Sequence, residues 1–379
     1  MRVLGLAAAV AGVAAAAAAG IGFVIARRLT APVSGRVFDL VVRDVVRRGD
    51  EEAVVLDRTA RTSALGIYNL WLDGGGWVRL GAVVAEGAAT VTRLVTCVIP
   101  DGSLHRGDRA SWSGIYFRDP ADAGLDAEDV VVDTLVGPAP AWLIPGEGGE
   151  SDHWAIHIHG MGSPRAGTLR GVQVASEAGL TSLVVTYRND SEGPTVGSGR
   201  STLGATERED VSAALRFALA SGARRITLFG WSMGAAIALQ LAADAEFRGV
   251  IDRLVLDSPV LDWTATINAN CRRAGLPSWF GAFARPWLHS HALARLVGLP
   301  SAVTLAPFDW LNRADELSLP ILVLHGIQDT SAPRALSSTL ARIRPDLVSL
   351  HEFDSDHTMT WNSDPKGWSG AVLRWLTAE

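Results

Sequence analysis

The second part of the sequence alternates between apolar runs and stretches of helix length. From Ala141 onward, runs such as WAIHIHG, LTSLVVTYR, RITLFGWS and ILVLHG are apolar almost throughout. Strands of this kind are buried on both faces of a mostly parallel sheet, because the connecting helices cover both faces. The stretches between the runs have helical periodicity. We therefore predict a doubly wound α/β domain over residues 137–379.

Residues 30–136 follow a different pattern, in which short β-like runs are separated by turn residues. Asp73-Gly74-Gly75-Gly76 lies between two of these runs, as a hairpin turn would. The pattern predicts a smaller β-rich module ahead of the α/β domain. This module contains no combination of residues that indicates catalysis. We assign its tryptophans Trp71, Trp77 and Trp112 to its core or to the interface between the domains.

The first 29 residues form a separate apolar segment. About 24 uncharged residues lie between Arg2 and Arg27, enough for a helix to cross the hydrocarbon core of a bilayer. We predict a transmembrane anchor; a cleaved secretory signal is the alternative, because small residues near position 20 resemble a signal-peptidase site. More arginines follow the segment than precede it, which favours a cytoplasmic body. An exported body is the alternative orientation.

Charge and spacing exclude several classes of protein. The 379 residues have a net charge of −6 and contain no basic cluster, which disfavours binding to nucleic acid. The two cysteines lie far apart, without the spacing of a zinc knuckle or a disulfide scaffold. His157 and His159, and also His289 and His291, form pairs that lack a convincing third ligand. We therefore expect no metal site.

One serine stands between two glycines where a predicted strand turns into a predicted helix. Gly230-Trp231-Ser232-Met233-Gly234 follows RITLF and precedes AAIALQLAA. A sharp turn strains the backbone of such a serine and requires small neighbours, so that strand and helix can approach each other. Ser232 would present its hydroxyl at the carboxyl edge of the sheet. The Met233 amide would lie beside it at a helix N-terminus, where it favours a developing oxyanion.

A serine hydroxyl becomes a nucleophile only when a base and an orienting acid accompany it. Asp329 follows the run ILVLHG and His357 follows VSLHEF, each on a loop after a predicted strand. Asp257 and Asp262, which follow the preceding strand, are the alternative acids. His351 is the alternative base, but it lies inside a predicted strand. We therefore favour Asp329 and His357.

Four motifs resemble those of the α/β-hydrolase superfamily. HIHGMGS, GWSMG, LHGIQD and DSDH occur in this order, each at a predicted strand end, within residues 140–379. Within the superfamily the sequence is most similar to the Bem46-like and prolyl-oligopeptidase-like bacterial serine hydrolases. The resemblance implies that Ser232 attacks an acyl carbonyl, His357 transfers the proton and Asp329 orients the imidazole. It also implies that the backbone amides of Met233 and Met161 form the oxyanion hole.

A long insertion, at about residues 263–312, separates two of the apolar runs. Because it contains helical pieces of its own, we expect it to form a cap over the site. Its aromatic side chains are expected to pack a small helical core, and some of them to line an apolar acyl pocket. The aromatic residues concerned are Trp263, Trp279, Phe280, Phe283, Trp287, Phe308 and Trp310.

The sequence thus predicts a membrane-associated serine hydrolase that cleaves a carboxylic ester, or an amide or thioester, through an acyl-enzyme. The expected partners are a small-molecule acyl substrate and, through the first segment, a membrane; no nucleic acid, metal or organic cofactor is implied. An acyltransferase or aminopeptidase with the same triad is an alternative. A catalytically silent binding module at the membrane is another. The oligomeric state and the substrate are left open.

Overall fold

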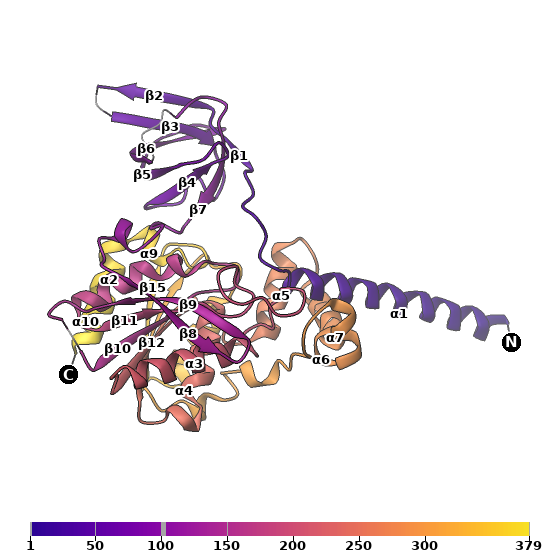
Figure 1. Ribbon diagram of the computed structural model, residues 1–379. Coiled ribbons are helices and arrows are strands. Elements are labelled where there is room, and N and C mark those ends of the chain that lie inside the picture. Colours follow the sequence, from indigo (N-terminus) through magenta and orange to yellow (C-terminus); the bar gives the residue numbers. More distant parts are fainter. Residues whose placement is uncertain (1, 50, 100–103, 150, 379) are drawn as a thin grey trace.

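The computed structural model describes residues 2–49, 51–99, 104–149 and 151–378, and its two sheets lie in separate parts of the molecule (Figure 1). Residues 1 and 379, the outer ends of the first and last expected segments, lie outside these ranges. The first sheet has seven antiparallel strands in the order β1-β7-β4-β5-β6-β3-β2. Its strands are β1 (Leu40–Val41), β2 (Asp44–Arg48), β3 (Glu51–Asp57), β4 (Tyr68–Leu72), β5 (Trp77–Glu86), β6 (Thr90–Ile99) and β7 (Arg109–Ser113).

The second sheet has eight strands in the order β15-β14-β13-β12-β10-β11-β9-β8. Strands β10 to β15 are parallel, and β8 and β9 extend the sheet as an antiparallel edge. The strands are β8 (Glu128–Thr134), β9 (Gly137–Ile144), β10 (His153–Ile158), β11 (Thr181–Val184), β12 (Arg225–Trp231), β13 (Ile251–Asp257), β14 (Ile321–Gly326) and β15 (Val348–Phe353).

Helices cover both faces of this sheet, as the apolar runs predict. Apolar residues of α3, α4 and α8 share one buried cluster with the sheet, whereas those of α2 and α10 share another. The doubly wound α/β architecture is therefore confirmed. The helices are α2 (Leu169–Glu177), α3 (Glu207–Ala220), α4 (Met233–Ala242), α8 (Arg334–Ile343), α9 (Thr360–Ser363) and α10 (Pro365–Thr377).

Strand β8 differs from the expected division of the chain. The sequence pattern placed residues up to 136 in the β-rich module, but β8 pairs along its whole length with β9 of the second sheet. The physical reason is that the two strands form a tight hairpin, closed at Thr134 and Gly137. Alternation within β8 predicts a strand, but it carries no information about which sheet the strand joins.

The insertion consists of short helices beside the N-terminal helix α1 (Arg2–Leu29), which projects from the body (Figure 1). Of the described helices, α1 is the one with the length and hydropathy needed to cross a membrane, a property that a signal sequence would share. The insertion contains α5 (Trp263–Arg273), η4 (Ser278–Ala284), α6 (Arg285–His289), α7 (His291–Val297) and η5 (Ala306–Phe308), and η6 (Ala314–Glu316) follows it.

Candidate active site

Ser232 lies at the turn between β12 and α4 in a strained backbone conformation. Its φ is 52° and its ψ is −110°, a region that a residue with a side chain adopts only when the surrounding structure holds it there. The two flanking glycines make this turn possible. A Cβ on Gly230 would lie 2.6 Å from the backbone of Ala235, and one on Gly234 would lie 2.0 Å from the carbonyl oxygen of Ile158. The small neighbours therefore let the helix start directly against the sheet.

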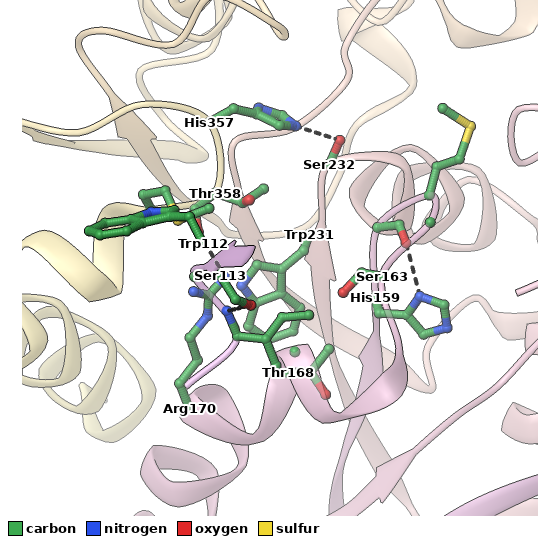
Figure 2. A pocket seen from close by; sticks show the side chains of 17 residues that line it. Trp112, Ser113, His159, Ser163, Thr168, Arg170, Trp231, Ser232, His357 and Thr358 are labelled. Atoms are coloured by element: carbon green, nitrogen blue, oxygen red, sulfur yellow. Dashed lines mark hydrogen bonds between the residues drawn. The ribbon is translucent and has the colours of Figure 1, made fainter. Parts of the chain in front are cut away.

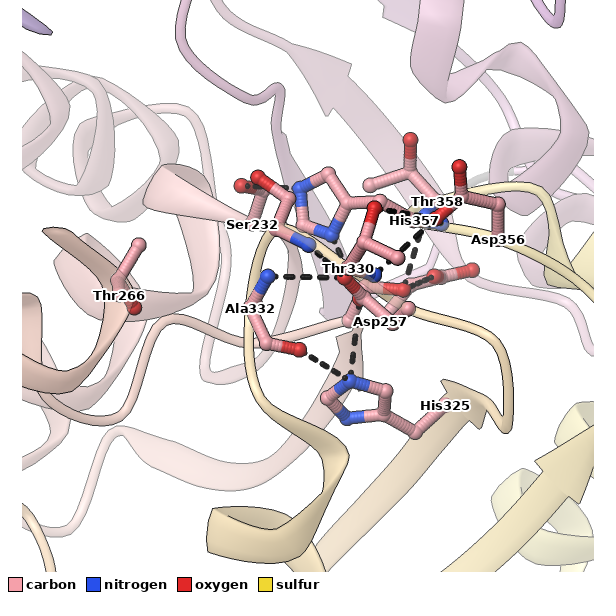
Figure 3. A network of polar contacts seen from close by, with 12 residues as sticks. Ser232, Asp257, Thr266, His325, Thr330, Ala332, Asp356, His357 and Thr358 are labelled. Carbon is pink, nitrogen blue, oxygen red and sulfur yellow. Dashed lines mark hydrogen bonds and ion pairs between the residues drawn. The ribbon is translucent and has the colours of Figure 1, made fainter. Parts of the chain in front are cut away.

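The loops after β14 and β15 bring an acid and a base to this serine (Figure 3). The Nε2 atom of His357 lies 2.8 Å from the Oγ of Ser232, and its Nδ1 lies 2.7 Å from the Oδ2 of Asp329. An ionised carboxylate only accepts hydrogen bonds, so Nδ1 carries the imidazole proton. Nε2 is then left to accept the proton of the serine hydroxyl. The three residues named from the sequence thus form one continuous chain of hydrogen bonds.

The side chain of Asp329 is fully buried and hydrogen-bonded on both oxygens. Its Oδ1 accepts from the backbone amides of Ser331 and Ala332, both at 2.8 Å, and its Oδ2 also lies 3.1 Å from the Nε2 of His325. Burial alone would raise the pKa of this carboxyl. The hydrogen bonds with His325 and His357 outweigh burial and hold the pKa far below its ordinary value of 3.8. The carboxylate is therefore ionised throughout the neutral range.

His325 is a polar residue of this site that the sequence analysis missed. It is the second-to-last residue of β14, within the motif LHGIQD, and is completely buried. Its Nδ1 lies 2.8 Å from the hydroxyl of Ser337, and its Nε2 faces Asp329 and the carbonyl oxygen of Ala332. The ring therefore fixes the position of the acid. In the sequence it is one more residue of an apolar strand, and nothing there marks it as a partner of Asp329.

The alternative acids and the alternative base have other surroundings. The Asp257 carboxylate accepts from Thr360 and from the indole of Trp368. Asp262 caps α5 by accepting from two backbone amides of its first turn. His351 is an exposed residue of β15. Among the described residues, neither carboxylate is hydrogen-bonded to Ser232 or His357, and nor is the ring of His351. Asp257 contacts Ser232 only through its backbone, whose carbonyl oxygen accepts from the Ser232 amide at 3.0 Å.

The loop after β10 passes directly beside Ser232. A Cβ on Gly160 would lie 3.3 Å from the Cβ of Ser232. His159 holds the loop: its Nε2 lies 2.9 Å from the Oδ2 of Asp190, and its ring stacks on Tyr187 at 4.3 Å. Met161, the expected oxyanion donor, follows on this loop and lines the same pocket as Ser232.

Met233 is the first residue of α4, directly after Ser232, and its side chain is buried. The two residues expected to form the oxyanion hole thus flank the serine, Met233 along the chain and Met161 across the pocket. Amides at the first turn of a helix have no partner within the helix, so the amide of Met233 is available to an incoming oxygen.

A pocket of about 270 Å³ opens beside Ser232 (Figure 2). Its walls come from four parts of the chain: the end of β7 and the residues after it, the loop after β10 with the start of α2, the turn at Ser232, and the loop after β15. The described lining residues are Trp112, Ser113, Gly114, Ile115, His159, Gly160, Met161, Gly162, Ser163, Gly167, Thr168, Arg170, Trp231, Ser232, His357, Thr358 and Met359.

The sequence analysis expected the insertion to cover the site. None of these described lining residues comes from residues 263–312, so the insertion does not cover this pocket. Trp263, Phe308 and Trp310 are buried in the main core instead. The β-rich module, to which no site was assigned, provides Trp112 as one wall. The physical reason is that the module packs over the carboxyl edge of the sheet near Met359, where a Cβ on Gly114 would clash with the Met359 sulfur.

Asn362 connects the β-rich module to the loop that holds His357. Its side-chain amide donates to the carbonyl oxygens of Ile67 and Gly114, both at 2.9 Å, and its Oδ1 accepts from Arg170. Arg170 in turn donates to the carbonyl oxygen of Thr358, the residue after His357. Because Asn362 and Arg170 are both buried, the module and the histidine loop are held by one network.

The histidine pairs considered as metal ligands have other partners. His157 is completely buried, lies 3.0 Å from the hydroxyl of Ser182 and stacks on Phe229. Burial lowers its pKa to about 3. His289 and His291 are exposed on the insertion. Within the described ranges, no group of three or more His, Cys, Asp or Glu residues is arranged to hold a metal ion.

Comparisons with known proteins identify the fold of the second part. Residues 196–307 match the family model described as alpha/beta hydrolase fold, and residues 41–113 match a domain of unknown function, DUF8805. A solved structure of an esterase from Pyrococcus furiosus is 22% identical, with a TM-score of 0.52 over 68% of this chain and 93% of that chain. The second part of the chain therefore has the α/β-hydrolase fold, which confirms the resemblance drawn from the motifs.

A second solved structure, an α/β serine hydrolase without lid from Xanthomonas campestris, is 17% identical. Its TM-score is 0.46, over 67% of this chain and 97% of that chain. A sequence comparison with curated proteins gives no match.

Proposed function

We propose that the protein is a membrane-anchored serine hydrolase that cleaves a carboxylic ester through an acyl-enzyme. The observation that carries this proposal is the chain of two short hydrogen bonds from Ser232 through His357 to Asp329. A half-buried serine with a strained backbone has no structural need for a histidine on its hydroxyl. The same arrangement is what nucleophilic attack on a carbonyl requires.

In the first half of the reaction, the Oγ of Ser232 attacks the ester carbonyl carbon while His357 Nε2 takes the hydroxyl proton. The carbonyl oxygen becomes an oxyanion, which the amides of Met233 and Met161 stabilise. His357 then delivers the proton to the leaving alkoxide, so that an alcohol departs and the acyl group remains on Ser232. In the second half, water attacks the acyl-enzyme with His357 again as base, and the carboxylic acid is released.

An ester is favoured as the substrate for two reasons. The Pyrococcus furiosus protein with the same fold is described as an esterase. In addition, the pocket beside Ser232 is partly open and of modest size, which suits a small acyl group. An acyltransferase or an aminopeptidase would share the first half of the reaction and differ in the entering or leaving group.

Anchoring rests on α1. Its 18-residue window Gly12–Leu29 has a mean hydropathy of 1.5, and only 11% of that window is buried. A helix that apolar is rarely left exposed to water in a folded protein. The arginines at its end, Arg27 and Arg28, favour the orientation with the body in the cytoplasm.

The function is tested by the hydrolysis of p-nitrophenyl esters with short acyl chains by the full chain in detergent. We expect Ser232→Ala to lower kcat by about 10⁴-fold or more, because no other group replaces the nucleophile. Hydrolysis by the unaltered protein at the rate of Ser232→Ala would contradict the proposal, provided that both proteins are folded by circular dichroism.

A further inference from the structure

Most of the insertion, residues 263–308, differs from the rest of the chain in its charge. Residues 263–308 contain four arginines and no acidic residue, and residues 1–38 likewise contain four arginines and no acidic residue. All 40 acidic residues but only 26 of the 34 basic residues lie outside these two segments, so the rest of the chain has a net charge of −14. These two segments, far apart in sequence, therefore have a net positive charge, whereas the rest of the chain is net negative.

These two segments meet in space, where the last turns of α1 dock on the insertion (Figure 1). A Cβ on Gly22 would lie 2.0 Å from the carbonyl oxygen of Phe283, and the rings of Phe23 and Trp287 are 5.0 Å apart. The side chain of Arg27 donates to the carbonyl oxygen of Val297. The insertion is thus attached to the end of the helix that joins the body.

The length of α1 places this attachment at the boundary of a bilayer. Residues 3–20 precede the docked turns and contain no charged residue. At about 1.5 Å per residue they span about 27 Å, close to the hydrocarbon thickness of about 30 Å. If these residues cross the membrane, Gly22 and the helices that touch it lie at the level of the lipid headgroups.

The insertion exposes the side chains that suit this level. Trp279 is 60% exposed and Leu296 is 64% exposed. The ring of Trp279 makes edge-to-face contacts with Phe280 at 4.4 Å and with Phe283 at 5.5 Å, so the exposed ring is part of an aromatic cluster beside α1. Tryptophan is enriched at membrane interfaces because its ring is apolar and its indole N–H is polar.

The four arginines of the insertion are exposed, and within the described chain no carboxylate pairs with them. Exposed cations next to apolar side chains match a surface of anionic lipid headgroups. Such lipids are concentrated in the cytoplasmic leaflet, which agrees with the orientation favoured by Arg27 and Arg28. These arginines are Arg272, Arg273, Arg285 and Arg295.

We propose that residues 263–308 form a membrane-contact face that rests on anionic lipid headgroups around the exit of α1. This inference rests on the proposed anchoring by α1 and goes beyond it. A single helix leaves a body free to tilt, whereas a helix with an adjoining lipid-bound face fixes its orientation. The insertion, expected to cover the pocket, would thus orient the catalytic domain relative to the membrane.

The test compares two exposed apolar positions in the full chain. An environment-sensitive fluorophore is attached at Leu296→Cys or, as the matched control, at Val84→Cys, both in a Cys97→Ser background; Val84 is 56% exposed on β5 of the first sheet. Each protein is reconstituted in vesicles of phosphatidylcholine and phosphatidylserine that carry a nitroxide lipid labelled near the headgroup. We expect several-fold stronger quenching at position 296 than at position 84.

Several outcomes decide between the proposals. Equal quenching at the two positions in protein that floats with the vesicles would overturn the membrane-contact face while leaving the anchor in place. Protein that does not float with the vesicles would overturn both. If quenching at position 296 increases with the number of protein molecules per vesicle and not with the nitroxide content, the face contacts a second copy of this chain and not the lipid.

A second variant tests the role of the arginines. We expect replacement of all four by Gln to weaken quenching at position 296 in vesicles with phosphatidylserine and to leave it unchanged in pure phosphatidylcholine. In the protein that keeps its four arginines, quenching at position 296 should also weaken at high salt, because screening weakens the attraction between exposed charges. Quenching that is independent of phosphatidylserine, arginines and salt would contradict an anionic lipid surface.

Discussion

Two carboxylates end neighbouring strands of the second sheet, and their surroundings give them different roles. Asp329, after β14, is hydrogen-bonded to His357 and His325, whereas Asp257, at the end of β13, binds Thr360 and Trp368. Both carboxylates are buried. Only one of them touches a group that the proposed reaction uses.

We therefore expect Asp329→Asn to lower kcat for ester hydrolysis by about 10⁴-fold, because the amide leaves the imidazole in the wrong tautomer. Asp257→Asn is the matched control. It should lower the free energy of unfolding, since it alters a buried hydrogen-bond network, while kcat of the folded protein stays within about tenfold of the unaltered value. Steady-state kinetics and urea unfolding of both variants measure these effects. A larger loss of kcat in Asp257→Asn would contradict the assignment of the acid.

His157 makes stability depend on pH. Burial lowers its pKa from 6.5 to about 3, so between these values the unfolded chain binds a proton that the folded chain does not. The stability contribution is complete above pH 6.5 and falls as the pH drops towards 3, by about 1.4 kcal/mol per pH unit. Urea unfolding at several pH values measures this effect, and the free energy of unfolding of His157→Gln should lack this part of the pH dependence. If the free energy of unfolding has the same pH dependence in the two proteins, the claim that His157 is buried in its neutral form is contradicted.

At the scale of elements, the contribution of β7 to the pocket was not predictable from local pattern. The turn at Ser232 and the strands before Asp329 and His357 were predictable, because apolar runs and turn glycines carry their own structural signal. Trp112 carries no such signal, since its place in the pocket depends on how one sheet packs against another. The insertion was recognised as helical for the same local reasons, but the surface against which it packs was not.

Trp112 also contacts the ring of Tyr68 at a tilted angle, with ring centroids 4.6 Å apart, and the guanidinium of Arg93 lies over its ring. These contacts fix the indole at the pocket wall. We expect Trp112→Ala to enlarge the pocket and to raise kcat/KM for bulky esters relative to acetate by about tenfold. Trp71→Ala is the control, because Trp71 stacks on Trp77 and does not line the pocket. Identical ester profiles for the two variants would exclude the β-rich module from substrate selection.

At the scale of the whole molecule, α1 has two parts with different expected roles. Residues 12–17 are exposed, whereas Gly22 and Ala26 are buried, as is Thr30 directly after the helix. The buried guanidinium of Arg200 donates to the carbonyl oxygen of Arg27 at 2.7 Å. The helix therefore serves as part of the fold as well as a candidate anchor.

Two truncations separate these roles. A chain without residues 2–17 should leave the membrane fraction and keep its stability, because the docked turns remain. A chain that begins at Ala31 should also be released, but its free energy of unfolding should fall by about 2 kcal/mol, since Arg200 loses a buried partner. Cell fractionation and urea unfolding measure both effects. Release of neither chain would contradict anchoring by α1.

The central claim is that Ser232 is a nucleophile activated by His357, and an active-site-directed fluorophosphonate probe tests it most directly. The account predicts covalent labelling of the full chain at Ser232, located by mass spectrometry of the labelled peptide. It predicts the same labelling of Ser163→Ala, which removes another serine of the pocket, and none of Ser232→Ala. A folded, unaltered protein that the probe does not label at Ser232 would contradict the account.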